Sequence, residues 1–381
     1  MIKNRKIDLV ILVPYFILSV IGLLEIYSAS SYRLMVTDEY SLSLLYRQFI
    51  FIIISLTIIG VTFFIKLEYL LHPLFIKGGL IVSFLLLIMV KVGFFAVTVN
   101  GAQRWISIGG LQFQPSEIIV IFLILYLASY FKNKNITNVK LTKPFIITGL
   151  ATGLVLLQPK ISGAFMIIVI VAVIIWAAAI PVEKGIMGIG LFLMGIILIA
   201  SIVLILGENN LLPTFFSHAY NRISIVHNPF LDEHGYGYQM ANSYYALYNG
   251  GFLGLGLGNS LTKQGYLPEA ETDFIFSIIS EELGLLGAIF VLFLIFVVCL
   301  RIFQKSIQCK DQQLSLVLIG FGTLILIQSS INVASVLGLI PMTGVPLPFV
   351  SYGGTSYLIL SFALGICLNI ISRKNLYLLK E

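Results

Sequence analysis

The chain has 381 residues, of which 59% are hydrophobic and only 10% are charged. Soluble domains average about 45–50% apolar residues, so this composition excludes an ordinary soluble domain and indicates a protein embedded in a membrane. The formal net charge of +6 could suggest a nucleic-acid partner, but the basic residues lie in short loops between apolar runs. That placement is typical of membrane orientation and argues against nucleic acid as a partner.

Ten apolar runs follow one another along the chain, at lengths close to the roughly 20 residues that a transmembrane helix needs. They are continuous, whereas the strands of a membrane β-barrel alternate over about ten residues. We therefore predict an all-α, polytopic membrane protein that forms a single domain over residues 1–381. The predicted helices cover about 9–29, 48–65, 74–92, 114–131, 144–158, 161–180, 185–206, 274–300, 314–337 and 352–372.

The basic residues also predict how these helices are oriented. An even number of helices puts both termini on one side, and assigning that side to the cytoplasm places most of the 23 Lys and Arg residues there. This agrees with the positive-inside rule. The longest loop, about residues 207–273 between the seventh and eighth helices, is then extracytoplasmic and contains about a third of the 17 acidic residues. We therefore expect the chemistry to take place on the outer face.

An outer segment leads into the fourth helix and reads NGAQRWISIGGLQFQPSE. Pro115 suits the first turn of a helix, and Ser116 and Glu117 complement the helix dipole, so we expect Ser116 to act as a cap. Arg104 and Trp105 need another explanation. An arginine at the interface can bind phosphate through two parallel hydrogen bonds, and tryptophan is common at membrane interfaces. Arg104 is therefore a candidate phosphate ligand.

Three further outer loops are rich in glycine, proline or serine. The first, GGFLGLGLGNS, lacks the strand–turn–helix context of a nucleotide-binding loop, and we expect close backbone packing in a loop that dips into the membrane surface. The second, QPKISGA, contains Lys160 and joins two helices. The third, TGVPLPFVSYGGTS, is uncharged and too long for a plain turn. We expect it to line a cavity, with Pro348, Ser351, Gly353 and Gly354.

The stretch LPEAETDFIF clusters the carboxylates Glu269, Glu271 and Asp273 at the mouth of the eighth helix. A capping anion is stabilising by about 0.3–1 kcal/mol and could account for Asp273 alone. Adjacent carboxylates repel and raise one another's pKa, and a carboxyl group with a raised pKa at a water–membrane boundary is suited to be a general base. Glu281 and Glu282 lie deeper on the same helix, where acids usually face a cavity or a partner.

Together these residues resemble the SEDS family (shape, elongation, division and sporulation proteins), the group of RodA, FtsW and SpoVE. The family's order and spacing are kept over nearly the whole chain by YSAS, NGAQRW, FQPSE, GYQMANSYYALYNGGFLGLGLGNSLTK, LPEAETDFIF and PLPFVSYGGTS. The resemblance implies a ten-helix protein of the bacterial cytoplasmic membrane that polymerises lipid II into glycan strands on the outer face. It also implies a class B penicillin-binding transpeptidase as partner, and a role in elongation, division or sporulation.

The resemblance also implies roles for individual residues. It assigns the essential catalytic carboxylate to Asp273 and places Arg104, Trp105 and Glu117 in the same cavity. Three positions depart from the family's pattern: Val120 replaces the usual lysine, Lys160 the usual aspartate and Glu271 the usual histidine. Charge is therefore relocated, and we hypothesise that Lys160 takes over the task of the lysine missing at position 120. The alternative is a divergent relative with weak or altered activity.

The implied reaction is an inverting glycosyl transfer between two lipid-linked disaccharide–peptides. The 4-hydroxyl of one attacks the anomeric carbon of the other, and undecaprenyl pyrophosphate leaves. Asp273 would take the proton as base, and Glu271 and Glu269 would modulate its pKa. A divalent cation, Mg²⁺ or Mn²⁺, would suit the pyrophosphate, although the sequence shows no metal-ligand set. The expected pyrophosphate-binding residues are Arg104, Trp105, Glu117, Lys160, Arg222 and Lys263.

Two other functions are compatible with the sequence. A flippase that moves lipid II outward would need charged residues near the middle of the membrane. Such residues are sparse in this chain, since Glu25, Glu281 and Glu282 are nearly all of them. A non-catalytic scaffold for the transpeptidase would fit the departures at positions 120, 160 and 271. The presence of Asp273 argues against the scaffold.

Overall fold

The computed structural model describes residues 5–36, 42–93, 96–99, 102–108, 111–132, 141–158, 160–179 and 228–373 except 234 and 236, with isolated positions between 194 and 226. Long helices dominate this part of the chain: α1 (Leu9–Val36), α2 (Ser43–Phe64), α4 (Pro73–Val92), α5 (Pro115–Phe131), α6 (Thr142–Leu156), α7 (Ile161–Ala179), α11 (Ile275–Gln308), α12 (Gln312–Val336) and α13 (Gly354–Ile371). The shorter elements are α3 (Leu67–Leu70), β1 (Ala96–Val99), β2 (Ala102–Ile108), β3 (Leu111–Phe113), η2 (Pro229–Asp232) and α10 (Tyr238–Gly250).

The described helices are apolar enough to form a multi-pass membrane protein. Seven of them have the length and hydropathy to cross a membrane, and α5 and α6 are apolar but shorter. They match nine of the predicted runs, while the run at about 185–206 falls largely outside the described residues. The multi-pass class is thus confirmed. The total of ten helices and the cytoplasmic placement of both termini stay predictions.

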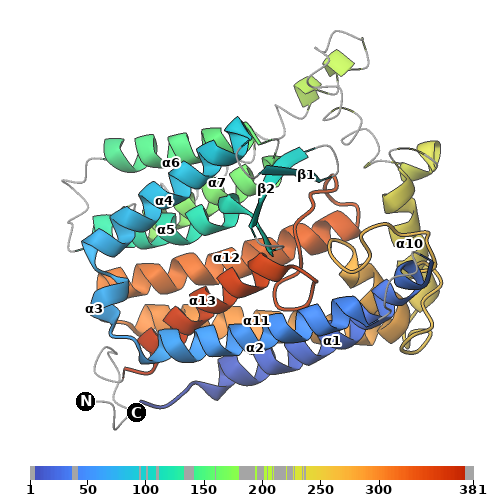
Figure 1. Cartoon of the computed structure of the whole chain (residues 1–381), viewed down its shortest axis with the longest axis horizontal. Coiled ribbons are helices and arrows are strands. Elements are labelled where there is room, and N and C mark those ends of the chain that lie inside the picture. The colour runs from blue at the N-terminus through green and yellow to red at the C-terminus, as the bar shows by residue number, and fades with distance from the viewer. Residues whose placement is uncertain are drawn as a thin grey trace.

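The long helices run side by side, and the bundle has two chemically different ends (Figure 1). At the end where α1 starts and α13 finishes, Arg5 Nη1 donates to the carbonyl of Phe63 over 2.7 Å, and Arg301 pairs with Asp8 at 2.9 Å. At the opposite end lie α10 and the loop that precedes α11. The chemistry-bearing motifs expected outside the membrane gather at this second end.

Helix α12 forms the centre of the bundle, because it packs against α5, α7, α11 and α13. Gly320 makes this close approach possible: a Cβ atom there would lie 2.4 Å from the Ile124 side chain of α5 and 3.1 Å from that of Ile174 of α7. Small residues serve this purpose in membrane helices, where backbones must approach closely to gain dispersion energy. The buried apolar side chains of the core surround this central helix.

The prediction of an all-α fold is wrong at one place. Residues between α4 and α5 form a small antiparallel sheet in the order β1–β2–β3, in which Trp105 pairs with Val97 and Ile106 with Phe113. The segment alternates apolar and polar residues and carries a Gly-Gly pair between β2 and β3, which is a hairpin signal. The apolar helices on either side masked this short pattern.

The long loop before α11 has its own packed structure in its described part. Leu255 and Gly256 donate backbone hydrogen bonds to the carbonyls of Glu281 and Glu282, both over 2.9 Å. At Gly284, α11 leaves helical geometry with φ of 68°, and a Cβ atom there would lie 2.4 Å from the backbone nitrogen of Gly254. The glycine-rich segment therefore packs closely by its backbone, as the sequence suggested, and it packs against the kink of α11.

Candidate active site

Asp273 lies in a tight turn immediately before α11. The carbonyl of Glu269 accepts hydrogen bonds from the N–H groups of Thr272, Asp273 and Phe274, over 3.1, 3.2 and 3.3 Å. Glu269 itself adopts a left-handed φ of 57°, which is uncommon for a residue other than glycine. Helix α11 begins at Ile275 without a side-chain cap. The capping explanation for Asp273 is therefore wrong, and its carboxylate is available for another task.

Three neighbouring groups hold the backbone of this turn in place. The carbonyl of Glu271 accepts from the N–H of Tyr352 over 2.9 Å, and that of Thr272 accepts from Ser351 Oγ over 2.6 Å. The carbonyl of Asp273 accepts from Asn332 Nδ2 of α12 over 2.9 Å. The loop before α13 and the end of α12 thus fix three successive residues. Rigid placement of this kind is what a reacting group needs.

Two cations act on the Asp273 carboxylate from other elements. Lys160 stands just before α7, is buried, and donates to Gln114 Oε1 over 2.5 Å and to Ser116 Oγ over 3.2 Å. Arg104 comes from β2. Ser116 therefore accepts from a lysine instead of capping α5, whose N-cap residue is Gln114. The sheet and the α6–α7 connection bring these two cations to the turn from distant parts of the sequence.

These surroundings change the pKa of Asp273 and that of Lys160. Burial and the neighbouring Glu269 and Glu271 carboxylates raise the pKa of Asp273 to about 7, although Lys160 and Arg104 oppose the rise. Burial lowers the pKa of Lys160, Arg104 lowers it further, and the carboxylates of Glu117 and Asp273 oppose that effect. A carboxyl group with a pKa near 7 can accept a proton at neutral pH and release it again, as a general base must.

A small cavity of about 30 Å³ adjoins this cluster, and its lining includes Glu117, Val120 and Lys160. Oε2 of Glu117 is buried and accepts no hydrogen bond, so the cavity offers an unused acceptor in a space that suits a water molecule. From the loop before α13, Val345 and Pro346 line the cavity. Other members of that loop were expected there, but Pro348, Ser351, Gly353 and Gly354 are outside its lining.

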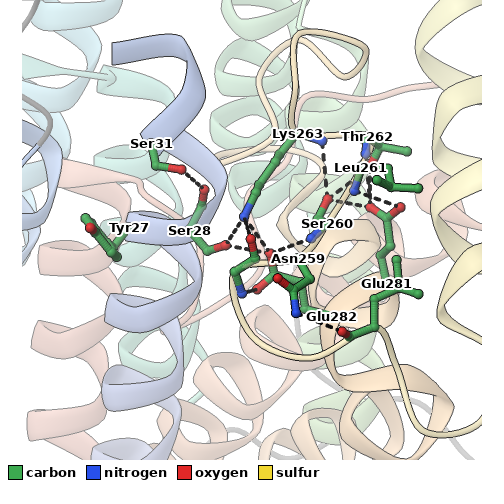
Figure 2. A network of polar contacts seen from close by, with 12 residues as sticks. Tyr27, Ser28, Ser31, Asn259, Ser260, Leu261, Thr262, Lys263, Glu281 and Glu282 are labelled. Atoms are coloured by element: carbon green, nitrogen blue, oxygen red, sulfur yellow. Dashed lines mark hydrogen bonds and ion pairs between the residues drawn. The ribbon is translucent and has the colours of Figure 1, made fainter. Parts of the chain in front are cut away.

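Lys263 belongs to a different network, whose charged side chains are buried (Figure 2). Its Nζ donates to Ser28 Oγ over 2.8 Å and to the carbonyl of Gly258 over 2.6 Å, and lies 3.1 Å from Glu282 Oε1. Glu281 is satisfied nearby by Ser260 and by Thr262, whose hydroxyls each donate over 2.5 Å. The expectation that Glu281 and Glu282 face partners is confirmed. This placement favours a structural role for Lys263 over a pyrophosphate contact.

Two expected site residues remain, Trp105 and Arg222. Trp105 is half-buried on β2 beside Arg104, so the sheet keeps the two together. Arg222 lies outside the described residues. No group of three His, Cys, Asp or Glu side chains in the described part of the chain is placed to hold a metal ion.

Sequence reasoning missed two residues that contact the turn. Asn332 is a buried amide within an apolar helix, and such a polar group in a membrane span is a usable signal of function. Arg33 at the end of α1 forms an ion pair with Glu271, at 2.5 Å between Nη2 and Oε1. Nothing in the local sequence points to this second contact, because its partners are far apart along the chain.

Comparison with known proteins places the chain among bacterial cell wall proteins. Residues 8–376 match the model of the FtsW/RodA/SpoVE family, described as cell cycle proteins. A protein of Enterococcus hirae described as a probable peptidoglycan glycosyltransferase FtsW is 64% identical over 98% of this chain and 94% of its own length. Stage V sporulation protein E of Bacillus subtilis is 32% identical over 98% and 99% of the two chains.

A solved structure has the same fold. It comes from work on the structural coordination of polymerization and crosslinking by a peptidoglycan synthase complex. The TM-score is 0.75 at 26% identity, and the match covers 96% of this chain and 97% of the other.

Proposed function

The chain belongs to the FtsW/RodA/SpoVE family and is a peptidoglycan glycosyltransferase, and we propose that Asp273 is the base of its reaction on the outer membrane face. The observation that carries this proposal is the Asp273 carboxyl group itself. It sits in a turn held by hydrogen bonds to the carbonyls of residues 271–273, and its pKa is raised to about 7. Lys160 and Arg104 supply positive charge beside it.

In the proposed reaction, the 4-hydroxyl of an acceptor lipid II loses its proton to the Asp273 carboxylate. The hydroxyl oxygen forms a bond with the anomeric carbon of the donor from the face opposite the pyrophosphate, so the configuration inverts. The bond between that carbon and the pyrophosphate oxygen breaks, and undecaprenyl pyrophosphate leaves with the electron pair. Asp273 then releases its proton to water. A positioned base contributes about 10²–10⁴-fold to such a step.

Lys160 is the proposed principal cation for the pyrophosphate, together with Arg104. Lys160 and Val120 line the same cavity, which supports the hypothesis that the charge missing at position 120 is supplied from the start of α7. A desolvated ammonium beside the leaving group stabilises the negative charge that develops there, because the local dielectric is low. Trp105 and Glu117 complete the proposed binding surface.

We also propose a divalent cation, Mg²⁺ or Mn²⁺, bound mainly through the oxygens of the pyrophosphate. Mg²⁺ usually combines one or two carboxylates with substrate phosphates and water instead of using an all-protein cage. The described residues provide no group of three His, Cys, Asp or Glu side chains for a metal ion, so the pyrophosphate would have to supply most of the ligands. Treatment with EDTA should then lower the polymer yield, and added Mg²⁺ or Mn²⁺ should restore it.

A crosslinking enzyme is the proposed partner. The solved relative comes from a complex in which polymerization and crosslinking are coordinated, and the match in fold extends over nearly the whole chain. We propose that this chain likewise acts beside a class B penicillin-binding transpeptidase in the cytoplasmic membrane. The high identity to a protein described as FtsW favours a role in division over sporulation.

The test is polymerisation of labelled lipid II by the purified full-length chain. Asp273→Asn should nearly abolish polymer, whereas Asp232→Asn, an exposed acid of the same outer loop, should leave it unchanged. A parallel liposome assay for outward movement of lipid II tests the flippase alternative. Wild-type polymer yield from Asp273→Asn would overturn the proposal. Movement without polymer would favour the flippase, and neither activity in the wild-type chain would favour the scaffold.

A further inference from the structure

Two side chains of α1 bind carboxylates of residues that precede and follow Asp273 in the sequence. Arg33 Nη2 lies 2.5 Å from Glu271 Oε1, and Ser28 Oγ donates to Glu282 Oε1 over 2.5 Å. Glu271 precedes Asp273 by two residues along the chain, and Glu282 follows it in the first turns of α11. The outer half of α1 therefore contacts the segment of the proposed base at one position before Asp273 and at one position after it.

The Arg33–Glu271 pair differs from an ordinary surface salt bridge. The Arg33 side chain is 50% exposed, but that of Glu271 is only 4% exposed. Pairs between two exposed groups contribute little, whereas removing the cation from a buried carboxylate leaves an uncompensated charge in a poorly solvated place. Burial raises the pKa of Glu271, and the positive charge of Arg33 opposes that rise. Arg33 thus favours the charged form of Glu271.

The backbone transmits the position of Glu271 to Asp273. The two residues belong to one turn, in which the N–H groups of residues 272–274 all point to the carbonyl of Glu269. Tyr352, Ser351 and Asn332 hold the carbonyls of that turn from the side of α12 and α13. The Arg33 pair holds the same turn from the side of α1, so the turn is fixed between two parts of the bundle.

We propose that Arg33 is a positioning residue for the glycosyl transfer, because its ion pair with Glu271 orients the turn and sets the charge that Asp273 faces. The inference rests on Asp273 being the base. The charged groups that face Asp273 are Glu269 and Glu271 from its own turn, Lys160 from the start of α7 and Arg104 from β2. From the side of α12 and the following loop, Asn332 Nδ2 donates to the carbonyl of Asp273, and a Cβ atom at Gly344 would lie 3.3 Å from Asp273 Oδ2.

The experiment compares the pH dependence of lipid II polymerisation by the purified full-length chain and its variants, between about pH 5 and pH 9. Arg33→Gln leaves the Glu271 carboxylate without its cation. The pKa of Glu271 then rises, so Glu271 is neutral over a wider pH range and repels the Asp273 carboxylate less. The acidic limb of the profile should move to lower pH, and the loss of the orienting pair should lower the rate on the plateau about fivefold. Glu271→Gln removes the neighbouring negative charge, so the limb should move to lower pH.

Two further variants complete the design. Arg33→Lys keeps the positive charge and should keep the midpoint of the acidic limb close to wild type. Lys91→Gln removes an exposed lysine of the same membrane face, whose Nζ donates to the carbonyl of Leu157 over 3.1 Å, and should change neither rate nor midpoint. Shifts of the midpoint to lower pH in both Arg33→Gln and Glu271→Gln separate charge positioning from a general loss of folded protein, which would lower the rate without moving the midpoint.

An unmoved midpoint in Arg33→Gln would overturn the inference, whether or not the amount of active protein fell. Asp273→Asn in the same assay separates this failure from that of the proposed function. If Asp273→Asn made normal amounts of polymer, the assignment of the base would be wrong. If Asp273→Asn were inactive while Arg33→Gln kept the wild-type profile, only the role of Arg33 would be lost.

Discussion

Activity and stability favour different protonation states of Asp273, because its pKa is raised in the folded protein. An aspartate in an unfolded chain has a pKa of about 3.9, whereas the pKa of Asp273 in the folded protein is raised to about 7. The folded state therefore binds more protons between these two values, and its stability falls as the pH rises from about 4 to about 7. The charged form that serves as base is the form that the fold tolerates least.

Asp273→Asn should consequently make the protein inactive and more stable at the same time. At pH 8 we expect its midpoint of thermal unfolding to exceed that of the wild type by about 2 °C or more, because the buried charge is gone. At pH 5 the difference should shrink, since Asp273 is then protonated in the fold. Thermal unfolding of the purified proteins measures this, with Asp232→Asn as control. A less stable Asp273→Asn at pH 8 would contradict the burial argument.

The relocation of charge from position 120 to position 160 can be tested by exchange. Lys160→Met preserves most of the side-chain volume but removes the ammonium that Gln114 and Ser116 hold, and should lower polymerisation about 10²-fold. Since Val120 lines the same cavity, adding Val120→Lys to this variant should restore part of the rate. Wild-type activity of Lys160→Met would show that Lys160 does not serve the reaction.

At the scale of elements, the kink of α11 depends on glycine. Gly284 has φ of 68°, and a Cβ atom there would lie 2.4 Å from Gly254 N and 2.5 Å from the carbonyl of Phe252. Gly284→Ala should therefore separate the glycine-rich loop from α11 and destabilise the fold by more than about 1 kcal/mol. Gly60→Ala in α2, where a Cβ atom would meet nothing within 4 Å, is the matched control. Thermal unfolding of both variants checks this. If Gly284→Ala were as stable as Gly60→Ala, the close packing of the glycine-rich loop against the kink would be contradicted.

The elements differ in how well the sequence predicts them, for physical reasons. Continuous apolar runs predict membrane helices directly, because a membrane helix must be apolar around its whole circumference over about 20 residues. The three strands are only 3–7 residues long and lie between such runs, so their alternation is too short to stand out from the apolar helices on either side. Helix α1 extends to Val36, beyond its predicted end near residue 29, because packing against α11 supports its polar outer part.

The site shows the same division between local and long-range information. Asp273, Arg104 and Lys160 could be selected from residue type, position on the outer face and family motif. Their pairings could not be selected in this way: Lys160 meets Gln114, and Arg33 meets Glu271, only after distant helices have packed. Lys263 illustrates the converse, because residue type suggested a phosphate ligand while packing places it against Glu282.

At the scale of the whole molecule, the two ends of the bundle should face opposite compartments. Arg5, Arg301 and Arg373 gather where α1 begins and α13 ends, and arginine and lysine favour the cytoplasmic side. The turn of Asp273, with α10 and its loop, lies at the other end, where lipid-linked substrates would meet the outer leaflet. The proposed reaction requires this second end to be extracytoplasmic, so membrane orientation tests the whole arrangement.

Cysteine labelling in intact cells can measure that orientation. Tyr248 of α10 is 85% exposed, and Tyr248→Cys should react with a membrane-impermeant maleimide added from outside. Lys310→Cys, exposed in the connection between α11 and α12, should react only after the membrane is permeabilised. The native Cys299, Cys309 and Cys367 are buried, so their background should be low. Labelling of Lys310→Cys in intact cells would reverse the orientation and would place Asp273 on the wrong side of the membrane for glycan synthesis.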